Sequence, residues 1–137
     1  MKLIDANVFL YSTGVEHEYK APSARVLAMC DEGLLEATTD VEAIQEMTHI
    51  LYSRRERDFG VEFIHEVLIA YPDAFSVTMS TINSAIDLMN RYPNLRSRDA
   101  IHAAVVFEHK LEGIISADRA FDGIAGLTRF DPKELAA

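Results

Sequence analysis

Several classes of protein are excluded by what the 137-residue sequence lacks. It holds one cysteine, Cys30, so no disulfide can form within the chain, and we expect a buried thiol in a reducing compartment. No apolar run approaches the roughly 20 residues that span a bilayer. The first residues meet polar side chains too early for a signal peptide. These absences predict a cytoplasmic protein with no membrane segment.

Basic residues are also scarce. Lysine and arginine number 13 against 22 aspartate and glutamate, which gives a formal net charge of −9. A protein that holds nucleic acid through phosphate contacts alone is normally basic. The acidic excess therefore argues against nucleic-acid binding unless metal cations supply the missing positive charge, and it also suits a basic protein partner.

The composition that remains is that of an ordinary globular protein. Apolar residues make up 49% and charged residues 26%, which suits a single domain over residues 1–137. The patterning predicts strands at 2–5, 34–39, 74–77, 113–116 and 127–130, and helices at 21–31, 41–55, 61–70, 81–92 and 97–111. This alternation indicates an α/β fold with a mainly parallel sheet covered on both faces. Functional sites in such sheets form at the carboxyl ends of the strands.

Three aspartates fall where this edge is expected. Asp5 closes the first strand and Asp118 follows the strand at 113–116. Asp99 lies in the first turn of the most apolar helix, for which Ser97 is the expected N-cap. Each alone is explained by a turn or by the helix dipole. Together they require a further explanation, because a buried charge without a partner costs several kcal/mol.

A fourth carboxylate, Glu46, is available on the helix at 41–55, on the same flank as Glu42 and His49. Several carboxylates at one edge repel one another unless a cation neutralises them. Oxygen ligands without cysteine or paired histidine favour Mg²⁺ or Mn²⁺ over zinc. Such ions bind phosphate and activate water, and two of them about 3.5–4 Å apart stabilise both oxygens of a displacement. A metal site would thus reconcile an acidic protein with a nucleic-acid substrate.

The order of the motifs resembles a known family. The sequence carries DAN at 5–7, Glu46, RDAIHA at 98–103 and SADRAFD at 116–122. This pattern resembles the PIN domain and, more narrowly, the VapC toxin component of VapBC-type toxin–antitoxin systems. The resemblance covers essentially the whole chain, and the last two motifs are its most specific part. It implies a three-layer α/β/α sandwich with a mainly parallel central sheet.

The resemblance also implies which residues form the site. Those matching the catalytic metal ligands are Asp5, Glu46, Asp99 and Asp118. Asp122 matches an additional acid near the metal, and Asn7 and Ser116 match supporting polar positions. Glu42 lies one turn before Glu46, so the second acid stays open between them. Glu46 is preferred because it precedes an apolar helical run.

In function, the resemblance implies a Mg²⁺- or Mn²⁺-dependent endoribonuclease that hydrolyses RNA phosphodiester bonds, forms a homodimer and is inhibited by a small, VapB-like antitoxin. Arg98 and Arg119 each adjoin a site acid, so we expect them to contact RNA phosphates. His102 lies one turn after Asp99 and could reach the site, but a structural role within its buried helix is favoured.

Other functions are weighed against this one. A PIN nuclease that processes RNA without an antitoxin would carry the same motifs. A catalytically silent module would use the acids only to bind a basic partner. A phosphatase with an aspartyl nucleophile would need a second aspartate two residues after Asp5, where the sequence has Asn7. RNA cleavage with and without EDTA separates a metal-dependent nuclease from the silent module.

Overall fold

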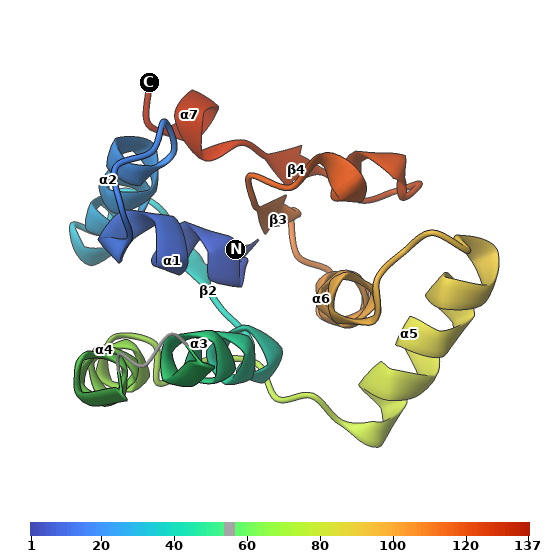
Figure 1. The fold of residues 1–137 in the computed structure, drawn as a ribbon. Coiled ribbons are helices and arrows are strands. Elements are labelled where there is room, and N and C mark those ends of the chain that lie inside the picture. The colour runs from blue at the N-terminus through green and yellow to red at the C-terminus, as the bar shows by residue number, and fades with distance from the viewer. Residues whose placement is uncertain (54–56) are drawn as a thin grey trace.

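The central feature of the fold is a small parallel sheet between two layers of helices (Figure 1). The computed structural model describes residues 1–53 and 57–137. The strands are β1 (Lys2–Ile4), β2 (Ala37–Thr38), β3 (Ile114–Ile115) and β4 (Arg129–Phe130). All pair in parallel in the order β2-β1-β3-β4. The predicted three-layer α/β/α sandwich is confirmed.

The helices form pairs around this sheet. They are α1 (Ala6–Thr13), α2 (Lys20–Asp31), α3 (Val41–Ser53), α4 (Arg57–Ala70), α5 (Met79–Arg91), α6 (Ser97–Glu108) and α7 (Pro132–Leu135), with a 3₁₀ helix, η1, at Arg119–Gly123. Figure 1 shows α1, α2 and α7 on one side of the sheet, α5 and α6 on the other, and α3 paired with α4 beside β2. Within the described residues, no helix is long and apolar enough to cross a membrane.

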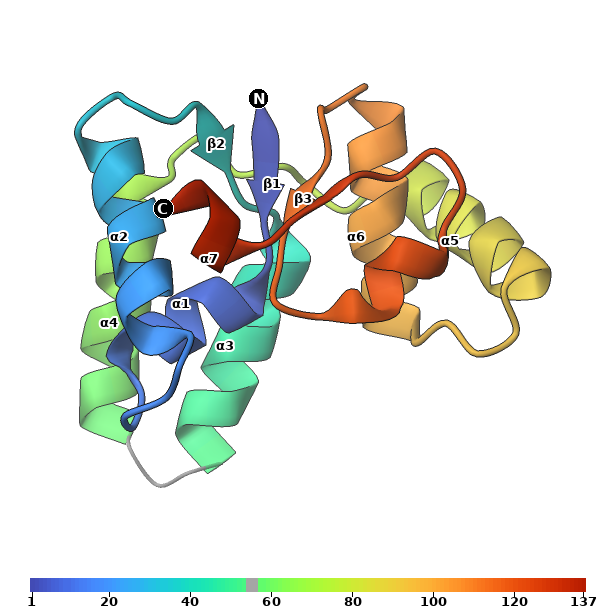
Figure 2. The same ribbon diagram turned by 90° about the horizontal axis from the view of Figure 1, so that it is seen from above.

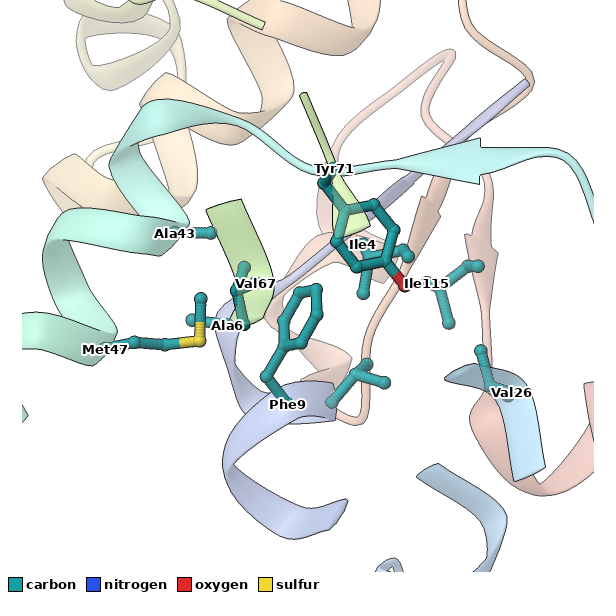
Figure 3. Packing of buried hydrophobic residues seen from close by; sticks show 10 residues of the cluster. Ile4, Ala6, Phe9, Val26, Ala43, Met47, Val67, Tyr71 and Ile115 are labelled. Carbon is teal, nitrogen blue, oxygen red and sulfur yellow. The ribbon is translucent and has the colours of Figure 1, made fainter. Parts of the chain in front are cut away.

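Alternating side chains of the central strands divide the core between the two faces. Ile4 and Ile115 join a cluster formed with α1 to α4 (Figure 3). In this cluster the rings of Phe9 and Tyr71 pack edge to face, with 5.4 Å between their centroids. Leu3 and Ile114 point the other way, toward α6 and η1. Because successive strand residues face opposite sides of a sheet, two-residue strands suffice to anchor both helical layers.

The carboxyl ends of the strands gather the segments that carry the candidate acids. In Figure 2, β1 and β3 end on the same side of the molecule, and α6 begins there. Helix α1 follows β1 directly, with Asp5 as its N-cap residue. Asp40 caps the start of α3, since its Oδ1 accepts a hydrogen bond from the Ala43 amide at 2.8 Å. Helix α6 is largely buried, as its apolar pattern predicts.

Some local predictions are wrong. The segment 74–77 is not a sheet strand: Phe75 makes only an isolated bridge with Asp40, because the chain turns at once into α5, which Thr78 caps. Ser97 lies inside α6, and Arg96 occupies the N-cap position without a side-chain bond. Helices α1 and α7 were not predicted. The predicted end of the helix at 41–55 lies outside the described residues.

Candidate metal centre

A cavity of about 630 Å³ lies at the carboxyl ends of the strands. Its lining consists of Asp5, Asn7, Leu10, Glu46, Arg96, Ser97, Arg98, Asp99 and Asp118. The four acids that the sequence singles out as ligands thus come from the end of β1, from α3, from α6 and from the segment after β3 to one shared space. Residues separated by more than a hundred positions meet here because β1 and β3 are neighbours in the sheet.

Asp5 is fixed at the floor of this cavity by hydrogen bonds. The residue is buried, at 5% exposure. Its Oδ2 accepts a bond from the Ser116 hydroxyl at 2.7 Å and one from the Asn7 amide at 3.1 Å. The Asn7 amide also reaches the Ser116 hydroxyl at 3.0 Å. Burial raises the pKa of Asp5, although His102 and the Ser116 hydrogen bond act in the opposite direction.

Asp118 and Asp99 approach from two further segments. The Asp118 amide donates to the Ser116 hydroxyl at 3.0 Å, and the Asp118 Oδ1 caps η1 by accepting from the Ala120 amide at 2.9 Å. Asp99 lies in the first turn of α6, and its Oδ2 is buried without a hydrogen-bond partner among the described residues. Burial, followed by the charges of Asp5 and Asp118, raises the pKa of Asp99 to about 6.

Glu46 rather than Glu42 lines the cavity. Burial first, and then the charge of Asp5, raises the pKa of Glu46. Arg98 lies against both glutamates: its Nη1 is 3.5 Å from Glu46 Oε1 and its Nε is 3.7 Å from Glu42 Oε1. The geometry therefore favours Glu46 as the second acid, with Arg98 at the rim.

His102 also reaches the acids, although the sequence favours a structural role for it. It is fully buried one turn after Asp99, and its Nδ1 lies 2.7 Å from Asp40 Oδ2. One atom each from His102, Asp5 and Glu46 lie within 4.8 Å of one another. Burial lowers the pKa of His102, but Asp40 and then Asp5 outweigh this and raise it to about 9. In the sequence, the position of His102 one helical turn after Asp99 was the feature that indicated it could reach the site.

Asp122 and Arg119 lie outside the cavity lining. The Asp122 carboxylate meets Arg129 through two hydrogen bonds, at 2.8 and 3.3 Å, which lower the pKa of Asp122. Arg129 also donates to the Ser116 carbonyl at 3.0 Å. Arg119 is exposed at the start of η1. The sequence did not single out Arg129, because its contacts depend on the pairing of β3 with β4.

The residues around the cavity fit a divalent cation. Three of the four carboxylates have pKa values raised by burial, with the charge of a neighbouring acid among the causes. The buried Asp99 oxygen has no partner among the described residues. A cation in this cavity would neutralise the carboxylates and occupy that oxygen, and carboxylate oxygens are suitable ligands for Mg²⁺ and Mn²⁺.

Comparison with known proteins agrees with this fold. The sequence profile of the PIN domain matches residues 2–127, so the chain belongs to the PIN domain family. It is similar to ribonuclease VapC13 of Mycobacterium tuberculosis, at 29% identity over 94% of this chain and 98% of that protein. Ribonuclease VapC7 of the same organism is 27% identical, over 96% of this chain and 92% of that protein.

Solved structures share the fold at low sequence identity. Mycobacterium tuberculosis VapC20, described as a sarcin-ricin loop cleaving toxin, superposes with a TM-score of 0.77 at 15% identity, over 93% of this chain and 97% of that one. A toxin–antitoxin complex from Klebsiella pneumoniae gives a TM-score of 0.69 at 17% identity, over 96% of this chain and 98% of that one. These similarities support the fold alone.

Proposed function

We propose that this protein is a metal-dependent endoribonuclease that hydrolyses RNA phosphodiester bonds and is the toxin of a VapBC-type toxin–antitoxin pair. The observation that carries the proposal is the meeting of four acids in one cavity of a PIN domain. The relatives named ribonucleases match over nearly their whole length, which supports the same activity here. The protein acts in the cytoplasm in this proposal.

The proposed ligands of Mg²⁺, or of Mn²⁺, are Asp5, Glu46, Asp99 and Asp118. When bound, such an ion neutralises phosphate charge and supplies an activated water. The chain itself orients the ligands: Ser116 and Asn7 hold Asp5 on one oxygen, and Ser116 accepts a bond from the Asp118 amide. This support fixes two ligands from neighbouring strands relative to each other.

In this proposal the remaining charged residues either bind the RNA or stabilise the segments that carry the metal ligands. Arg98, about half exposed at the rim, contacts a phosphate of the RNA, and Arg119 contacts another further out. Asp122 acts as an additional acid beside the metal centre through Arg129, whose bond to the Ser116 carbonyl steadies the segment that leads to Asp118. Asp122 is therefore expected to matter less than the four cavity acids.

The test is cleavage of a total RNA preparation by the purified chain in Mg²⁺, with the variants Asp5→Asn and Asp118→Asn. Each should lose at least about a hundredfold in rate, because a neutral amide binds a cation weakly. Asp58→Asn is the matched control, since Asp58 is a fully exposed acid on α4. Chelation by EDTA should stop the wild type. Wild-type rates in Asp5→Asn would contradict the nuclease mechanism.

The toxin role predicts a small antitoxin partner and a homodimer. An apolar groove of about 420 Å³ between α3 and α4, bordered by the exposed Tyr52, Val61 and Leu68, supports protein docking on this face. Expression of this protein in bacterial cells should arrest their growth, and co-expression of the antitoxin should relieve the arrest. RNA cleavage without growth arrest would favour an RNA-processing nuclease. Light scattering of the purified chain measures the proposed dimer.

A further inference from the structure

A nitrogen atom faces the proposed ligands without a role in the proposed function. His102 Nε2 lies 3.5 Å from Asp5 Oδ1 on a side chain that is fully buried in α6. Within the described part of the chain it has no hydrogen-bond partner. A buried polar atom left without a partner is destabilising. The position of this nitrogen beside the carboxylates therefore needs an explanation.

The orientation of the His102 ring is set by Asp40. The Asp40 Oδ2 lies 2.7 Å from the ring Nδ1, while its Oδ1 caps α3 through the Ala43 amide. Both carboxylate oxygens are thus fixed. Because a carboxylate only accepts, Nδ1 donates to Asp40, and the Nε2 lone pair is the one that a cation can bind, in place of the second proton of the imidazolium. That lone pair faces the space shared with Asp5 and Glu46.

We propose that His102 Nε2 is a nitrogen ligand of the cation held by Asp5 and Glu46, and that Asp40 is the positioning residue that orients it. A carboxylate bonded to the far nitrogen of a metal-binding imidazole fixes its orientation and raises its basicity. The inference rests on the proposed function in one respect, since both need a divalent ion in this cavity.

A nitrogen ligand changes which ion the cavity prefers. Mg²⁺ is bound almost entirely through oxygen, whereas first-row transition metals accept imidazole. A set of carboxylates with one imidazole therefore favours Mn²⁺ over Mg²⁺. The all-oxygen site expected from the sequence gives no such preference through its ligands.

Pulsed electron paramagnetic resonance on the metal-free full chain, loaded with one equivalent of Mn²⁺, tests the ligand directly. A ¹⁴N nucleus bonded to Mn²⁺ modulates the spin echo, and ¹⁵N-labelled histidine identifies it. We expect this modulation in the wild type and its loss in His102→Gln. The exposed His65→Gln is the control and should keep it. Bound Mn²⁺ without nitrogen modulation, or modulation that survives in His102→Gln, would overturn the proposal.

Asp40→Asn provides a second variant if the buried His102 cannot be replaced in a folded protein. It keeps the imidazole and the acceptor that caps α3. Calorimetry should show Mn²⁺ binding about tenfold more weakly, as for other residues that orient metal ligands, with Mg²⁺ affinity nearly unchanged. Unchanged Mn²⁺ affinity, or equal losses for both ions, would contradict nitrogen ligation. Asp5-dependent RNA cleavage without a nitrogen signal would leave the nuclease standing and remove only this ligand.

Discussion

At the scale of single residues, burial and neighbouring acids disfavour the ionised forms of the site carboxylates Asp5, Glu46 and Asp99. Asp99 shows this most clearly, because its pKa is about 6 in the fold against an ordinary value of 3.8. A raised pKa means that the folded metal-free protein holds this proton more tightly than the unfolded chain does. The resulting penalty is absent below about pH 4, grows as the pH rises to 6 and is constant above it.

Asp99→Asn should therefore stabilise the metal-free protein. We expect the free energy of unfolding at pH 7 in EDTA to rise by about 1 kcal/mol, allowing for solvent screening at a half-buried group. The gain should vanish near pH 4, where the wild-type carboxyl is also neutral. Thermal unfolding at the two pH values measures this. A variant less stable than the wild type at pH 7 would show that Asp99 is not repelled by its neighbours.

Ser116→Ala tests the support of the ligands. The hydroxyl bonds Asp5 and accepts from the Asp118 amide, so its loss should lower RNA cleavage at limiting Mg²⁺ about tenfold. Excess Mg²⁺ should restore part of the rate. Ser23→Ala is the matched control, since the Ser23 hydroxyl is buried on α2 without a partner among the described residues. Equal rates in the two variants would remove Ser116 from the site.

The location of a site residue can be predicted from the sequence when it directly follows a recognisable strand or begins a recognisable helix. Asp5 and Asp118 could be located because each follows a short apolar strand, and Asp99 because it opens a buried helix. The contacts of Arg129 and His102 could not be derived in this way. The His102–Asp40 bond joins residues 62 positions apart, and no periodicity encodes such a distance.

At the scale of elements, the site depends on how β3 lies between its neighbours. Gly113 precedes β3, and a Cβ atom at this position would overlap the Thr128 carbonyl oxygen and come within 2.9 Å of the Phe130 ring. The same carbonyl accepts the bond from the Ile114 amide at 2.9 Å. Close approach of the two backbones thus aligns β3 with β4 and, through β3, places Ser116 beside Asp5.

Gly113→Ala should consequently separate β3 from β4. We expect a loss of about 2–3 kcal/mol in the free energy of unfolding, as for overpacked core positions. Urea unfolding followed by circular dichroism measures it. Gly123→Ala, with open space around the added atom, should change the same quantity by less than about 0.5 kcal/mol. Similar values for both variants would contradict the role of this contact.

The elements that the sequence predicts are those with clear periodicity. The parallel strands and the long helices were located from apolar spacing. Helix α1 was missed because residues 6–13 are rich in apolar and aromatic side chains and follow β1 without a turn. The strand expected at 74–77 failed for a tertiary reason, since the chain passes the sheet only at Phe75 on its way to α5.

At the scale of the whole molecule, the net charge of −9 and the acidic cavity predict that divalent cations stabilise the folded state. An ion that binds only the folded chain raises the free energy of unfolding by about 2.7 kcal/mol at a hundred times its dissociation constant. Adding Mg²⁺ should thus raise the melting temperature of the wild type. The rise in melting temperature should be much smaller in Asp5→Asn. Equal shifts in both proteins would point to general screening of surface charge.

The proposed nuclease activity and the proposed nitrogen ligand both depend on a divalent ion bound among Asp5, Glu46, Asp99 and Asp118. Anomalous diffraction from crystals of the full chain soaked in MnCl₂ tests this most directly, because the signal locates manganese independently of any assay. We predict a strong peak inside the cavity, in contact with Asp5 and at least two of the other acids. A cavity without a peak in crystals that bind manganese elsewhere would contradict the metal centre and the nuclease built on it.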